Sequence, residues 1–143
     1  MISLIGKTNN KGFTLIEVCL VGVVLSLIFA ISWPILNRSA RLTQLETTCK
    51  EISYTLRYAR DYALNENKYY TVEFNIPEHS YGLAGSARYW PKDIEAGVSD
   101  QKLIFSPDGT SPDFKISLKN IQGNICTLKL EGSTGKTTIQ TQK

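Results

Sequence analysis

The chain has 143 residues and a formal net charge of +3, which leaves room for a membrane segment and one modest domain. Its three cysteines and single histidine cannot assemble a zinc site, which needs three or four ligands at workable spacing. Without Lys7 and Lys11, the remaining chain carries 14 basic and 13 acidic side chains, so charge gives no case for strong nucleic-acid binding. We expect no metal and no other cofactor.

The amino-terminal segment is a short basic leader followed by a long apolar run. Two lysines and no acid precede Gly12, and the run from Phe13 to Leu36 contains one charge, Glu17. The part after Glu17 can cross roughly 30 Å of hydrocarbon as a helix. An ionisable side chain at the head of a spanning segment is expensive in hydrocarbon, so Glu17 is a candidate functional residue.

One helix is predicted from about Thr14 to Asn65. Beyond Asn37, apolar residues recur at steps of three and four, which is the spacing of a helix with one buried face. This stripe consists of Leu42, Leu45, Cys49, Ile52, Leu56, Ala59 and Ala63. At about 1.5 Å per residue the helix would be roughly 75 Å long. Pro34 lies inside it and is predicted to kink it, because proline removes a backbone hydrogen bond.

Short runs of alternating apolar and polar residues follow, which is typical of half-buried strands. The runs are Tyr70–Ile76, Tyr81–Ala84, Leu103–Phe105, Phe114–Leu118, Cys126–Glu131 and the weaker Lys136–Gln140. Residues 85–101 are expected to be irregular, because Trp90-Pro91 and Gly97 interrupt them. One long helix followed by five or six short strands predicts an α+β fold with an antiparallel β domain.

The helix stripe is expected to cover one face of the sheet. That face consists of Tyr70, Val72, Phe74, Phe114, Ile116, Leu118, Leu128 and Leu130. The stretch Gly132–Thr137 lacks the glycine spacing of a phosphate-binding loop, so we interpret it as a hairpin turn.

The segment Gly12-Phe13-Thr14-Leu15-Ile16-Glu17-Val18, between a basic leader and an apolar run, resembles the type IV prepilin signal. The resemblance implies that a prepilin peptidase cuts between Gly12 and Phe13, that Phe13 is then N-methylated, and that the helix is retained as a membrane anchor. It also implies a role for Glu17 in filament assembly. Pairing with the amino terminus of an adjacent subunit would offset the desolvation of its carboxylate. The alternative is a plain single-span anchor in which Glu17 stays solvated.

A second resemblance lies near the carboxyl terminus. The segment Leu103–Leu118 and the closing Gly135-Lys136 strand resemble the minor pseudopilin group GspH/FimT. This implies the pilin-like fold. The chain would divide into a leader (1–12), a transmembrane half-helix (13–36), an amphipathic half-helix (37–66) and a β-rich soluble domain (67–143).

The resemblance implies a minor structural subunit of a type II secretion pseudopilus, which supports protein export. The alternative is a minor type IV pilus subunit in pilus assembly or DNA uptake. The implied partners are the prepilin peptidase, other pilin-like subunits and an inner-membrane assembly platform. The chain would cross the inner membrane once, with its amino terminus in the cytoplasm and its β domain in the periplasm or another extracytoplasmic space. A membrane-anchored enzyme or sensor is the third reading. It is disfavoured because no Ser/His/Asp or Cys/His arrangement is readable.

Two further sets of residues have open interpretations. Cys49 lies on the helix stripe and Cys126 on the inward face of its strand, so they are either core residues or a disulfide pair formed in an oxidising compartment. The looser resemblance implies basic residues near the carboxyl terminus that touch phosphates in the DNA-uptake variant of the family; the matching positions here are Lys136 and Lys143, and Lys129 lies nearby in the sequence. So few lysines would give weak, salt-dependent binding, and nucleic acid is not an expected partner.

Overall fold

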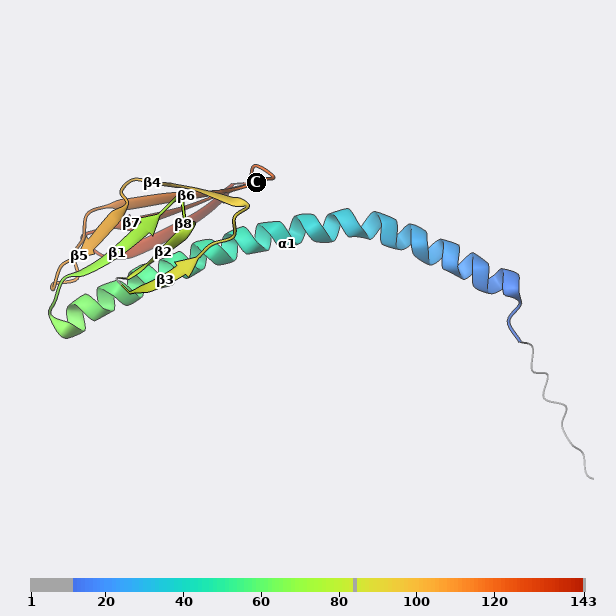
Figure 1. Ribbon diagram of the computed structural model, residues 1–143, viewed down its shortest axis with the longest axis horizontal. Helices are drawn as coiled ribbons and strands as arrows, with labels where there is room; N and C mark the ends of the chain where they lie inside the picture. Colours follow the sequence, from blue (N-terminus) through green and yellow to red (C-terminus); the bar gives the residue numbers. More distant parts are fainter. Residues whose placement is uncertain (1–11, 84, 143) are drawn as a thin grey trace, which may run out of the picture. The chain divides into compact units, whose positions relative to one another are not determined.

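One long helix, α1, runs from Leu15 to Glu66, close to the predicted boundaries. The computed structural model describes residues 12–83 and 85–142, without the side chains of residues 34–36. The chain divides into two compact units after Arg38. The first contains the amino-terminal part of α1, and the second contains the rest of the helix and all the described strands (Figure 1). The kink expected at Pro34 stays a prediction.

The strands follow the helix directly along the chain. They are β1 (Tyr70–Asn75), β2 (Ser80–Leu83), β3 (Ser86–Tyr89), β4 (Ile94–Val98), β5 (Lys102–Phe105), β6 (Phe114–Asn120), β7 (Ile125–Glu131) and β8 (Lys136–Gln142). The expectation that residues 85–101 are irregular is wrong, because β3 and β4 lie there. Both are held by backbone ladders, β3 on β2 and β4 on β6. All four residues of β3 are exposed, so no alternation of apolar side chains marks it.

The strands form two antiparallel sheets of four, where the sequence had indicated one sheet face. The first has the order β3-β2-β1-β5 and the second the order β4-β6-β7-β8. Phe74 lies opposite Tyr81 in the first sheet, and Leu118 lies opposite Cys126 in the second. The inward residues of both sheets join one core with α1.

The predicted helix stripe supplies one side of that core. Leu45, Cys49, Ile52, Leu56, Ala59 and Ala63 are each at most 1% exposed. Of the expected sheet face, all members are buried except Tyr70, which is half-buried. The apolar face of the helix and the apolar faces of the strands therefore pack into one core, as the α+β interpretation requires.

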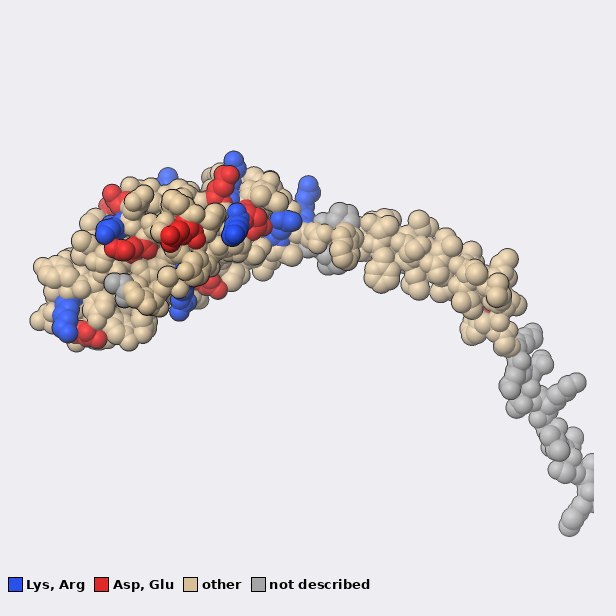
Figure 2. Space-filling model, in the orientation of Figure 1, with Lys and Arg blue, Asp and Glu red and all other residues tan. Residues whose placement is uncertain are grey.

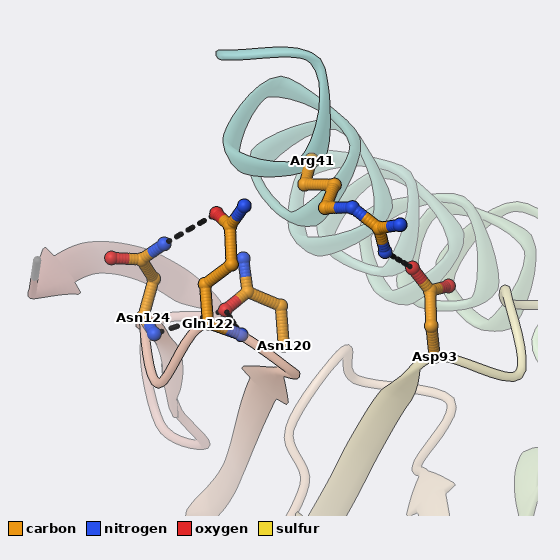
Figure 3. A network of polar contacts seen from close by, with 5 residues as sticks. All are labelled: Arg41, Asp93, Asn120, Gln122 and Asn124. Atoms are coloured by element: carbon orange, nitrogen blue, oxygen red, sulfur yellow. Dashed lines mark hydrogen bonds and ion pairs between the residues drawn. The ribbon is translucent and has the colours of Figure 1, made fainter. Parts of the chain in front are cut away.

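Two polar contacts join α1 to loops of the β domain within the second unit. Arg41 of α1 donates to Asp93, just before β4, with 3.1 Å between Nη1 and Oδ2 (Figure 3). Arg60 donates from Nε to the carbonyl of Gly109 at 3.0 Å. Gly109 has a φ of 78°, and an added Cβ would meet the side chain of Leu64. Glycine suits this turn between β5 and β6 because other residues rarely adopt such a positive φ.

Candidate functional site

Thr14 and Glu17 organise the start of the helix. The Thr14 hydroxyl accepts a hydrogen bond from the backbone N–H of Glu17 at 3.3 Å, as the first residue of a capping box does. Glu17 is exposed and lies in the first turn of α1, where the helix dipole favours a negative charge. Phe13, just before the helix, is 81% exposed. The peptide bond between Gly12 and Phe13 therefore lies outside regular structure, and its cleavage stays a prediction.

The amino-terminal part of α1 has apolar side chains on all sides. An 18-residue window reaches a mean hydropathy of 2.6 with none of it buried. On the face shown in Figure 2, Lys and Arg side chains gather on the second unit, while the helix before Arg38 consists almost entirely of uncharged residues. A helix that is apolar all round, with none of its apolar window buried among the described residues, is a candidate membrane anchor.

Cys49 and Cys126 are brought together across the core. Both are fully buried free thiols. The neighbouring Cys126 thiol, together with burial, raises the pKa of Cys49 above its ordinary value. The neighbouring Cys49 thiol lowers the pKa of Cys126 below its ordinary value, helped by Thr141, whose hydroxyl donates to Sγ at 3.8 Å. The structure thus joins the two cysteines that the sequence had singled out, and their oxidation stays a prediction.

Lys136 opens β8, directly opposite Glu131. It lines a cavity of about 460 Å³ with Lys115, Lys129, Asp113 and Glu131. The lining therefore includes both acids and lysines, so the charge around this cavity is mixed. Lys143 lies outside the described residues.

The glycine-rich stretch before Lys136 is the turn between β7 and β8. The N–H of Gly135 donates to the carbonyl of Glu131 at 2.8 Å, and the Thr134 hydroxyl donates to the Glu131 carboxylate at 2.7 Å. The hairpin interpretation is confirmed.

Some buried polar atoms have no hydrogen-bond partner among the described residues. They are His79 Nδ1, Tyr81 Oη, Trp90 Nε1 and Asn120 Nδ2. The other polar atom of Asn120 is satisfied, since Oδ1 accepts the backbone N–H groups of Gln122 and Asn124 at 3.0 Å each (Figure 3). His79 has a φ of 52° and lies in the turn before β2, as expected of a loop residue.

No group of three or more potential metal ligands lies within residues 12–83 and 85–142. Sequence reasoning overlooked a different feature, a row of tyrosines on α1 at Tyr54, Tyr58 and Tyr62. Their spacing of four residues, on a helix face opposite an apolar stripe, is the signal that could have revealed it.

No protein-family profile and no curated protein sequence matches the chain. Among solved structures, the minor pseudopilin EpsH from the type 2 secretion system of Vibrio cholerae is similar with a TM-score of 0.58 and 8% identity, covering 68% of this chain and 96% of that one. The type IV minor pilin FimU of Pseudomonas aeruginosa is similar with a TM-score of 0.56 and 14% identity, over 68% of this chain and 89% of that one. A second crystal form of FimU gives 0.52 and 16%.

At these identities the likeness concerns the fold. The chain has the type IV pilin-like fold, with one long amino-terminal helix packed on antiparallel sheets. The α+β pilin-like expectation is therefore confirmed.

Proposed function

We propose that this chain is a minor pilin-like subunit of a type II secretion pseudopilus, where it supports protein export as a structural, non-catalytic component. One observation carries the proposal. The helix is apolar on every side in its first part and, further along, apolar on one side only, where it closes the core of a folded domain. A helix of this kind can lie in a membrane first and among the helices of other pilin-like subunits in a filament later, because both surroundings are apolar.

The proposed life cycle follows from the head of the helix. A prepilin peptidase cuts between Gly12 and Phe13, and Phe13 becomes the N-methylated amino terminus. The chain crosses the inner membrane once, with its β domain on the extracytoplasmic side, until an assembly platform transfers it to the filament. There the exposed carboxylate of Glu17 meets the positive amino terminus of an adjacent subunit. An opposite charge offsets the cost of burying the carboxylate among apolar helices.

The alternative is a minor subunit of a type IV pilus. The likeness to FimU supports it about as well as the likeness to EpsH supports a pseudopilus. Deleting the gene separates the two systems. Loss of secreted enzymes from the medium with normal surface pili supports the pseudopilus, and loss of pili with normal secretion supports the alternative.

The experiment on the shared role uses cells with an active prepilin peptidase. Intact-mass analysis of the membrane-extracted protein should give a chain that begins at N-methylated Phe13. Glu17→Val should still insert, since the helix becomes more apolar, but its recovery in sheared filaments should fall sharply. Thr14→Val is the matched control, because it removes the cap hydroxyl and keeps the charge. Retention of residues 1–12, or normal recovery of Glu17→Val in filaments, would contradict the proposal.

A further inference from the structure

The row of tyrosines on α1 presents an aromatic surface to solvent. Tyr54 and Tyr58 are 64% and 53% exposed. The rings of Tyr58 and Tyr62 lie 4.4 Å apart between centroids, and their hydroxyls are hydrogen-bonded at 2.7 Å. That contact orders both side chains before any partner arrives. Ordered, exposed tyrosines are the residues that most often anchor protein interfaces.

A cavity of about 370 Å³ lies between this row and the strands β2 and β3. Its lining includes Tyr54, Thr55 and Tyr58 from the helix and Gly82, Ser86 and Arg88 from the strands. The helix side is aromatic, and the sheet side contributes one cation. The cavity thus combines an apolar wall with a single charged group, as peptide-side-chain pockets do.

Arg88 is the charged group of this cavity. Within the described residues no carboxylate lies in ion-pairing distance of it. Beneath it is Tyr81, which lies opposite Arg88 in the β2–β3 ladder and is only 2% exposed. Burial and the negative charge of Glu51 raise the pKa of Tyr81, and Arg88 and Thr55 oppose that rise. Neither completes a hydrogen bond with it, so a buried polar atom is left unpaired beside an unpaired guanidinium.

The strand beside the cavity has a free edge. Among the strands that the structure describes, β3 pairs only with β2. The Trp90 N–H donates to the His79 carbonyl at 2.9 Å, so the alternation of an antiparallel ladder turns the N–H and C=O groups of Ala87 and Tyr89 outward. An exposed edge of this kind is a template for another strand.

We propose that β3 receives an extended, acidic segment of another envelope protein as a fifth strand of the first sheet. The segment would pair with the outward groups of Ala87 and Tyr89. Strands lie about 4.8 Å apart, and alternate side chains point to the same face, so every second side chain would cover the tyrosine row. A Glu or Asp side chain on that face would meet Arg88, whose planar fork binds a carboxylate through two hydrogen bonds.

A second copy of this chain does not fit the same site. Pairing β3 with β3 would bring two Arg88 guanidinium groups into one patch without an acid between them, and like charges on neighbouring strands are destabilising. The occupant is therefore a different protein with an acid on an extended segment. The inference rests on the proposed function in one respect: that function places the β domain, and therefore the partner, in the envelope.

A defined peptide tests the site on the full-length chain in detergent micelles. The probe is fluorescein-labelled Thr-Val-Thr-Glu-Thr-Val-Thr, with a second probe in which Gln replaces Glu, and the readout is fluorescence anisotropy. The Glu peptide should bind saturably. The Gln peptide should bind at least about tenfold more weakly, because a charge-assisted hydrogen bond is lost. Arg88→Gln should abolish this difference. Lys136→Gln, which removes the same charge from the other sheet, should preserve it.

Two variants examine the geometry. Ala87→Pro removes an outward N–H that β2 does not use, so it should prevent binding while the fluorescence of buried Trp90 reports an intact fold. Arg88→Glu should shift the preference to a peptide with Lys in place of Glu. Equal affinity for the Glu and Gln peptides would overturn the proposal. So would self-association of the chain that Ala87→Pro abolishes, since it would assign the edge to a second copy. These outcomes need no filament, so they are independent of the Glu17→Val result.

Discussion

Cys49 and Cys126 show how one contact at the scale of single residues can join two parts of a fold. Cys49 belongs to the helix stripe, Cys126 to β7, and both are fully buried. The two thiols are neighbours in the core, where the pKa of Cys49 is raised and that of Cys126 is lowered. Two thiols that lie together in this way can be joined in an oxidising compartment.

We therefore expect a Cys49–Cys126 disulfide in protein folded in an oxidising compartment. Thiol–disulfide exchange with an oxidised dithiol carrier would take two electrons and two protons from the pair and reduce the carrier. Closing so long a loop should raise the free energy of unfolding by about 2–4 kcal/mol. Alkylation under denaturing conditions without reductant should modify Cys19 alone, and Cys19→Ser should leave stability unchanged. Alkylation of all three cysteines in membrane-extracted protein would show that Cys49 and Cys126 are reduced core residues without a disulfide.

At the scale of elements, the helix stripe and the inward residues of both sheets form one core. Leu56, in the middle of the stripe, is 1% exposed. Leu56→Ala should lower the free energy of unfolding by about 2–5 kcal/mol, because it leaves a cavity that the neighbours only partly fill. Denaturant unfolding followed by Trp90 fluorescence measures this. Arg57→Ala, on the exposed face one residue along, should stay within about 0.5 kcal/mol. A loss below about 1 kcal/mol for Leu56→Ala would mean that the stripe contributes little to packing.

The elements differ in how far the sequence predicts them. The stripe from Leu45 to Ala63 and the strand around Ile116 could be predicted because burial imposes a period on side chains. No such period marks β3, where every side chain is exposed and only backbone pairing holds the strand. The division into two sheets was missed for the same reason, since strand order depends on which backbones pair. Glu17 could be predicted as a functional residue because it is the one acid in an apolar run. The cavity beside Arg88 could not be predicted, because its lining comes from three separate elements.

At the scale of the whole molecule, the second unit contains the core and the first does not. Every fully buried side chain named in the core lies at or beyond Leu45, and none of the described side chains from residue 12 to residue 33 is buried. A chain starting at Asn37 should therefore be soluble, monomeric and cooperative in unfolding. A chain starting at Lys50 loses Leu45 and Cys49 from the stripe and should be clearly less stable. Sedimentation and denaturant unfolding measure both. Aggregation of the longer chain would mean that the second unit needs the anchor.

The charge of the molecule decides whether it binds DNA. Lys136, Lys129 and Lys115 line one cavity, but Asp113 and Glu131 line it too, so the local potential is far from uniformly positive. Lysine meets phosphate as a point charge, without the fork of arginine. Two or three such contacts give weak binding that falls steeply with salt. We expect no useful affinity of the soluble part for a labelled duplex at about 150 mM salt, measured by fluorescence anisotropy. Low-micromolar binding that Lys136→Ala abolishes and Lys102→Ala preserves would instead favour a role in DNA uptake.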